Sequence, residues 1–76
     1  MMVDDLNLSD ERLKLSKREL EILNLLSEGL GTKEIGELLN ISVHTVTTHR
    51  KNMLNRAKKP NAASLVSLAF RKGILR

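Results

Sequence analysis

The sequence contains no cysteine and only one aromatic residue, Phe70. Without cysteine there can be no disulfide, no thiolate nucleophile and no cysteine-ligated zinc. Proteins that bind single-stranded nucleic acid stack bases on aromatic rings, so one aromatic side chain counts against that class. No apolar run approaches the ~20 residues that a membrane helix needs, and the acidic N-terminus lacks a signal-peptide pattern. We therefore expect a cytoplasmic protein with no membrane partner.

Acidic residues are absent from the second half of the chain. All nine Asp and Glu residues lie in residues 1–37, together with five Lys or Arg. The bases of residues 38–76 are Arg50, Lys51, Arg56, Lys58, Lys59, Arg71, Lys72 and Arg76. The two parts thus carry formal charges of −4 and +8, which agree with the net charge of +4. A segment with basic residues only attracts phosphates and indicates a nucleic acid as the partner.

The spacing of apolar residues predicts an all-α fold of four helices in a single domain. Residues 1–14 are predicted to be a polar, acidic tail or linker, and residues 15–76 the domain. The predicted helices cover Ser16–Glu28, Lys33–Leu39, Val43–Ala57 and Ala62–Lys72. Because Phe70 is the only aromatic residue, the core must consist mainly of Leu, Ile, Val and Met.

Helix ends are marked by capping residues. Ser16 and Glu19 have the spacing of a capping box, in which each side chain satisfies a free backbone N–H of the first turn. Gly29 can take the left-handed conformation that ends the first helix. The expected N-caps of the other three helices are Thr32, Ser42 and Asn61, and Gly73 is expected to end the last helix.

The second predicted helix contains a glycine that needs an explanation. Gly36 costs roughly 1 kcal/mol relative to Ala inside a helix. We expect it because another helix backbone passes close to that position. Ile35, Leu38 and Leu39 are expected to face the core. Asn40 tolerates the left-handed geometry of the turn that follows.

Residues 32–56 have the layout of a helix-turn-helix, with a short helix, a tight turn and a longer helix. One side of the longer helix holds Val43, Val46, Met53, Leu54 and Ala57. Thr47, Thr48 and Lys51 form an outward strip at i, i+1 and i+4. Lys suits guanine acceptors, and Thr offers a hydroxyl and a methyl group that can touch thymine. The strip could be an ordinary solvated face, but the turn before it and the absence of acids favour base contacts with duplex DNA.

Phosphate contacts are expected at the helix starts and beside the strip. Helix N-termini attract anions through free N–H groups and the helix dipole. This reasoning selects Thr32 and Lys33 at one helix and Ser42, Val43 and Thr45 at the next. The bases that can reach the flanking backbone are Arg50, Lys58 and Lys59, although charged residues in loops often touch nothing.

Catalysis and metal binding are not predicted. His44 and His49 are five residues apart, so they diverge by about 140° around the helix and cannot share a metal. Gly29 and Gly31 lie in a connection between helices and form no Gly-rich phosphate loop. We expect neither enzymatic activity nor a cofactor or metal ion.

The last predicted helix is more apolar than one core contact requires. Its apolar residues span roughly 220°, where about 100° suffices. It should therefore cover something besides its own core. This leaves open a second function, a protein-interaction or dimerisation module that uses residues 62–72 without reading DNA. Salt distinguishes the two, because DNA binding by a basic face weakens steeply with salt.

Several short motifs together resemble the LuxR-type helix-turn-helix family. The matching residues are Leu15-Ser16-Lys17-Arg18-Glu19, Ile22-Leu23, Gly29, Lys33-Glu34-Ile35, Ile41-Ser42, Thr45-Val46 and His49. The similarity runs in register from Leu15 to Leu75. The family comprises DNA-binding modules of quorum-sensing regulators, of two-component response regulators and of some stand-alone bacterial transcription factors.

The resemblance implies a four-helix domain, winged-helix-like but without a wing. Its third helix would enter the major groove of double-stranded DNA, and its fourth would form a symmetric dimer. Base contacts would fall to Thr47, Thr48 and Lys51. Phosphate contacts would fall to Thr32, Lys33, Thr45 and His49. Glu19 would be structural, and the dimer interface would include Leu65, Leu68 and Ala69.

The sequence departs from the family pattern at a few positions. Thr47 replaces a common Lys, so the base preference should be the chain's own. Ala57 and Lys59 replace apolar residues near the junction of the third and fourth helices. We therefore expect a monomer or weak dimer in free solution and a homodimer on DNA. RNA polymerase is a further candidate partner of such a regulator.

Overall fold

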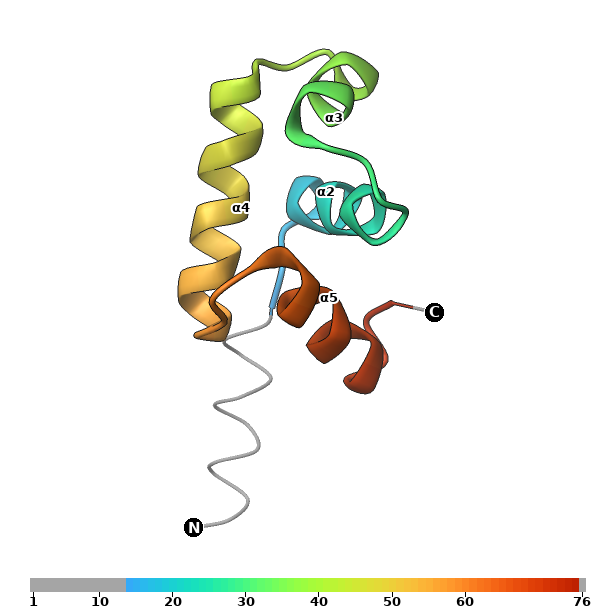
Figure 1. Ribbon diagram of the computed structural model, residues 1–76, viewed down its shortest axis with the longest axis vertical. Coiled ribbons are helices and arrows are strands. Elements are labelled where there is room, and N and C mark those ends of the chain that lie inside the picture. Colours follow the sequence, from blue (N-terminus) through green and yellow to red (C-terminus); the bar gives the residue numbers. More distant parts are fainter. Residues whose placement is uncertain (1–13, 76) are drawn as a thin grey trace, which may run out of the picture.

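A computed structural model describes residues 14–75 of the chain, and within that range every regular element is a helix. The helices are α2 (Lys17–Ser27), α3 (Thr32–Leu39), α4 (Val43–Ala57) and α5 (Ala62–Arg71) (Figure 1). The predicted all-α fold with a helix-turn-helix is confirmed, and each helix lies within two residues of its predicted bounds. The predicted tail lies outside the described residues, except for Lys14.

The longest helix, α4, runs along one side of the molecule (Figure 1). It packs against each of the other helices, with α3 near its N-terminal end and α5 near its C-terminal end. Helix α2 lies between them and contacts all three. The core contains Ile22, Leu23, Ile35, Val46, Met53, Leu65, Ala69 and Leu75. Because this shared core holds one face of α4, the opposite face is left for a ligand.

Most predicted caps are present. The Ser16 hydroxyl accepts a hydrogen bond from the Glu19 N–H at 3.1 Å, and the Glu19 carboxylate accepts one from the Ser16 N–H at 3.0 Å. Asn61 caps α5 through its side chain, which accepts from the Ser64 N–H at 2.9 Å. Gly29 ends α2 with a φ of 91°. These local signals therefore set the helix ends as predicted.

The start of α3 differs from the prediction. Gly31, not Thr32, is the N-cap residue, and Thr32 is the first residue of the helix. The backbone N–H of Gly31 donates to the Glu34 carboxylate at 2.9 Å. Glu34 thus satisfies the N-cap backbone from within the first turn, so no hydroxyl is needed at the cap position.

The prediction that Leu38 faces the core is wrong, because 64% of this residue is exposed. Helix α3 is only eight residues long and turns Ile35, Gly36 and Leu39 towards its neighbours. At about 100° per residue, Leu38 points roughly 100° away from the middle of that face. Helical spacing alone had grouped it with Leu39.

The turn between α3 and α4 explains Gly36. A Cβ atom at this position would lie 2.8 Å from the carbonyl oxygen of Ile41 and 3.6 Å from the backbone nitrogen of Val43. The predicted close approach is therefore present, but the backbone that approaches is the turn itself and the start of α4. Asn40 takes the predicted left-handed conformation, with φ 59°.

A second left-handed residue was not predicted. Lys58 follows the last turn of α4 with φ 56° and ψ 46°. Its N–H donates back to the Asn55 carbonyl at 3.2 Å, and the Lys59 N–H donates to the Leu54 carbonyl at 3.0 Å. A positively charged residue thus occupies a conformation that usually selects Gly.

Candidate nucleic-acid interface

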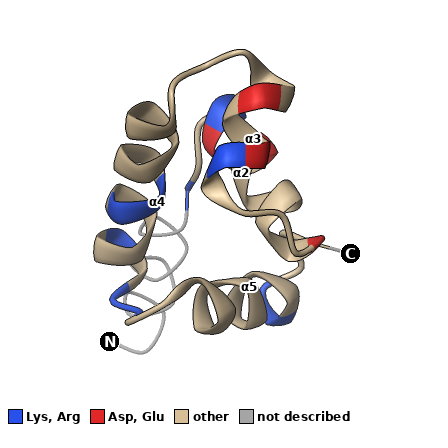
Figure 2. Cartoon of the chain, turned by 45° about the horizontal axis from the view of Figure 1, so that its top comes forward, with Lys and Arg blue, Asp and Glu red and all other residues tan. Residues whose placement is uncertain are grey.

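The predicted reading strip lies on the surface of α4. Thr47, Thr48 and Lys51 are all exposed, whereas Val46 and Met53 on the other side of the helix are buried. The core contacts of Val46 and Met53 hold the helix, so the strip has a fixed direction. Helix α4 contains no acidic residue, and its Lys and Arg residues lie in its C-terminal half (Figure 2). The exposed face of α4 therefore carries no negative charge that would repel phosphate. Base contact by Thr47, Thr48 and Lys51 stays a prediction.

The start of α4 presents two neighbouring hydroxyl groups. The Ser42 hydroxyl oxygen accepts a hydrogen bond from the Thr45 N–H at 3.0 Å and lies 2.9 Å from the Thr45 hydroxyl oxygen. Whichever hydroxyl donates to the other, one hydroxyl proton is left over. The pair can therefore offer a donor to an anion, although the Thr45 N–H itself is used by the cap.

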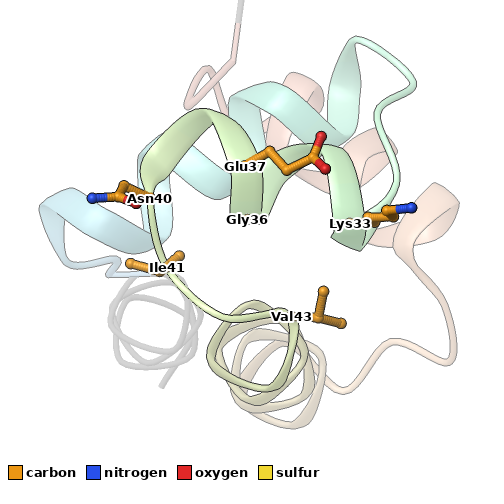
Figure 3. Close-up of a pocket in the computed structure, with 6 residues that line it drawn as sticks. All are labelled: Lys33, Gly36, Glu37, Asn40, Ile41 and Val43. Atoms are coloured by element: carbon orange, nitrogen blue, oxygen red, sulfur yellow. The ribbon is translucent and has the colours of Figure 1, made fainter.

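The starts of α3 and α4 border one groove (Figure 3). Lys33 lies on the α3 side and Val43 on the α4 side, and both are exposed. The other residues that line the groove are Gly36, Glu37, Asn40 and Ile41. Thr32 is half-buried at the first position of α3. Two predicted phosphate-binding helix starts thus lie side by side.

The remaining predicted phosphate contacts differ in accessibility. Lys58 is exposed just beyond the end of α4, whereas Arg50 and His49 are half-buried. His49 lies near enough to Glu19 for its positive charge to favour the Glu19 carboxylate. This places His49 on the α2 side of α4, away from the middle of the reading strip. Its phosphate contact, which only the family resemblance implied, stays a prediction.

Sequence reasoning missed an ion pair between α4 and α2. A guanidinium nitrogen (Nη2) of Arg56 contacts a carboxylate oxygen (Oε2) of Glu19, which is buried. The other terminal nitrogen of Arg56 (Nη1) donates to the Lys14 carbonyl at 3.1 Å. Arg56 was counted among the bases of the second half, but here it links α4 to α2. Its partner was too far away in sequence for any spacing rule to find it.

The surroundings of Glu19 lower its pKa overall. Burial raises the pKa, but the hydrogen bond from Arg56, the backbone hydrogen bond from Ser16 and the charges of Arg56 and His49 outweigh it. The carboxylate is therefore ionised at neutral pH, and its charge favours the position of Arg56 against α2.

Two of the three predicted dimer residues belong to the protomer's own core. Leu65 and Ala69 are each 1% exposed, so they offer no surface to a second chain, and their assignment to an interface is wrong. The outer surface of α5 instead includes half-buried Leu68 and Phe70, which is 48% exposed. The apolar residues of α5 span more of the helix than one contact needs. The sequence alone therefore did not show which of them would be buried in the domain's own core.

Other kinds of site are not evident in the described part of the chain. Among residues 14–75, no group of three or more His, Asp or Glu residues could hold a metal ion. None of the helices in this range is long and apolar enough to span a bilayer.

Comparison with known proteins agrees with this geometry. The family described as bacterial regulatory proteins, luxR family, matches residues 13–69. The chain belongs to the luxR family. The resemblance predicted from its motifs is thus confirmed. This luxR-family chain is a DNA-binding domain of a transcriptional regulator, and its family is not a class of enzymes.

Curated relatives include two proteins named oxygen regulatory protein NreC. The one from Staphylococcus aureus (strain bovine RF122 / ET3-1) is 43% identical over 72 residues, and the one from Staphylococcus haemolyticus (strain JCSC1435) is 40% identical over 72 residues. Each alignment covers 95% of this chain and 33% of the relative. The luxR-family chain therefore spans about one third of the length of these relatives.

Proposed function

We propose that this luxR-family domain reads a specific duplex DNA sequence by placing α4 in the major groove. The observation that carries the proposal is the exposed strip of Thr47, Thr48 and Lys51 on a helix without acidic residues. Lys51 donates to guanine acceptors, and the two threonines contact neighbouring base edges. These three side chains contribute to the sequence specificity.

Phosphate contacts fix the register of the domain on the duplex. We assign them to Thr32 and Lys33 at the start of α3 and to Ser42, Val43 and Thr45 at the start of α4, with Val43 acting through its backbone N–H. His49, Arg50 and Lys58 contact the backbone beside the groove. The leftover hydroxyl proton of the Ser42–Thr45 pair supports the assignment at α4.

Two copies bind inverted half-sites about one helical turn apart. The outer surface of α5, which includes Leu68, provides the contact between them. Because the area on such a short helix is small, the association is weak in free solution and is strengthened by the shared duplex.

The length of the relatives supports a regulatory setting for the domain. The domain acts as the output part of a longer cytoplasmic regulator, of the response-regulator kind, whose other parts receive the signal. RNA polymerase is its proposed partner at the promoter. The named relatives are oxygen regulatory proteins, but the signal of this chain belongs to the part of a regulator that lies outside the domain.

Selected-site enrichment tests the proposed readout. Wild-type protein should enrich one motif, and Lys51→Ala should flatten the preference at one position at a cost of about 1–3 kcal/mol on the best site. The matched control is Lys33→Ala, which removes the same charge from α3. It should weaken all sequences about equally and reduce the salt slope by about one.

An unchanged motif at full contrast with Lys51→Ala would refute the assignment of Lys51. The alternative function, a protein-interaction module built on α5, is favoured by the exposed Phe70. It predicts association that is insensitive to salt and no enriched motif.

A further inference from the structure

Val43, the first residue of α4, has an exposed apolar side chain without a role in the core. Helical spacing predicted that Val43 lies with Val46 on the apolar side of α4. In the structure, however, 47% of Val43 is exposed and Val46 is fully buried. Figure 3 shows the side chain on the wall of the groove, across from Lys33. The prediction that Val43 joins the apolar face is therefore wrong, because α3 packs against this end of α4 without covering the Val43 side chain.

The position of Val43 continues the reading strip. Val43, Thr47 and Lys51 follow one another at i, i+4 and i+8, so they lie along one ridge that turns by about 40° per step. All three residues are exposed. Val43 therefore extends the strip by one turn towards the helix N-terminus, which is the end that contacts base edges in a helix-turn-helix.

The chemistry of the side chain selects its partner. The apolar feature of base pairs in the major groove is the C5-methyl group of thymine. The Val43 side chain has no hydrogen-bond donor and so cannot bind a phosphate, which leaves the phosphate contact to the backbone N–H of this residue. On the basis of the proposed DNA readout, we propose that the Val43 side chain contacts a thymine methyl group and makes the chain prefer thymine to cytosine at that position.

The helix geometry also places this thymine. Four residues of helix rise by about 6 Å, which is close to two base-pair steps of ~3.4 Å. The thymine contacted by Val43 therefore lies about two base pairs from the base contacted by Thr47, on the side of the α4 N-terminus.

Replacing thymine by uracil removes only the methyl group, so it tests the contact directly. Each thymine of the enriched site is replaced in turn by uracil, and binding is measured by fluorescence anisotropy with wild-type protein, Val43→Ala and the isosteric Val43→Thr. At one position, wild type should lose about fourfold in affinity, as expected for burial of one methyl group. Val43→Ala should bind the thymine and uracil duplexes with equal affinity at that position. Val43→Thr should show part of the wild-type loss of affinity.

Two controls separate this contact from others. Thr47→Ser removes a methyl group from the neighbouring position and should leave the effect at the Val43 thymine unchanged. Leu38→Ala removes another exposed apolar side chain, outside the groove, and should leave the whole uracil profile as in wild type. Circular dichroism of each variant verifies its helical content.

Val43→Ala protein that shows the wild-type loss at every uracil would overturn the inference. So would a variant weakened equally on thymine and uracil duplexes at all positions, since Val43 would then contact something other than a methyl group. In both cases the enriched motif itself survives, and so does the proposed function. If wild type enriches no motif at all, the proposed function fails and the inference fails with it.

Discussion

Arg56 on α4 and Glu19 on α2 form an ion pair that links these two helices. Glu19 is only 8% exposed, and it also completes the cap of α2 by accepting from the Ser16 N–H. Arg56 in turn donates to the carbonyl of Lys14, where the described chain begins. The direction of α4 therefore depends on one charge pair as well as on apolar packing.

Glu19→Gln should destabilise the domain mainly by removing this charge. Glutamine can still accept the Ser16 N–H in a capping box, so the helix cap survives and Arg56 loses its counter-ion. Removing one partner of a buried pair costs several kcal/mol, but Arg56 is partly exposed, so we expect about 1–3 kcal/mol in urea denaturation at neutral pH. Glu19→Ala, which also loses the cap, should cost more.

The pH dependence of stability gives a second test of the same pair. The pKa of Glu19 in the folded protein is lowered from its ordinary value of 4.5. Its charge therefore stabilises the fold fully above that value, and this contribution is lost as the pH falls through the lowered pKa. The stability difference between wild type and Glu19→Gln should shrink over this acidic range. A difference that stays constant down to the lowest measurable pH would show that the charge is not responsible.

Gly36→Ala should destabilise the domain by about 1–3 kcal/mol, as expected for overpacking, although Ala is the better helix former. The added Cβ would lie 2.8 Å from the Ile41 carbonyl oxygen, and a backbone atom cannot move aside as a flexible side chain can. Gly31→Ala is the matched control, since its Cβ would meet only the Glu34 carboxylate at 3.9 Å. It should cost less. Equal urea midpoints for wild type and Gly36→Ala would contradict the close approach.

The sequence was sufficient for features that depend on neighbours within one or two helical turns. The capping box of Ser16 and Glu19, the left-handed Asn40 and the outward direction of Thr48 and Lys51 all belong to this class. Chemical pattern and the 100° step of a helix determine them. The fold class followed, because four capped helices with one apolar face each have few ways to pack.

Other features depend on tertiary packing and could not be derived in this way. Leu38 and Val43 have the spacing of core residues but lie where no other helix covers them. Conversely, Leu65 and Ala69 are buried by neighbours that helical periodicity cannot identify. The Arg56–Glu19 pair joins residues on two helices whose contact had to be known first. Of the candidate site, the exposure of Thr47, Thr48 and Lys51 could thus be predicted, whereas that of Val43 could not.

Lys58→Gly should stabilise the domain by roughly 0.5–1 kcal/mol. Lys58 holds φ at 56°, which brings the Cβ of an L-residue close to its own carbonyl group, whereas glycine adopts this conformation without that cost. Lys58→Ala removes the same charge but keeps the Cβ, so it should bring no gain. Urea denaturation measures both variants. DNA affinity should fall equally in the two, and a larger loss for one would mean that backbone conformation, not charge, matters for the contact.

Leu68→Glu should separate two bound copies without unfolding the domain. Leu68 is half-buried and lies outside the core cluster, so a carboxylate there can stay in water, whereas at a dimer contact it would be buried without a partner. Binding to a half-site should be unchanged, and cooperative binding to the full site should disappear. Phe70→Glu is the matched control, because Phe70 lies about 160° from Leu68 around α5, so a symmetric interface centred on Leu68 leaves Phe70 outside it. Fluorescence anisotropy on half-sites and full sites decides the matter. Equal losses on both sites with Leu68→Glu would place Leu68 in the core, and loss of cooperativity with Phe70→Glu alone would move the interface to the other flank of α5.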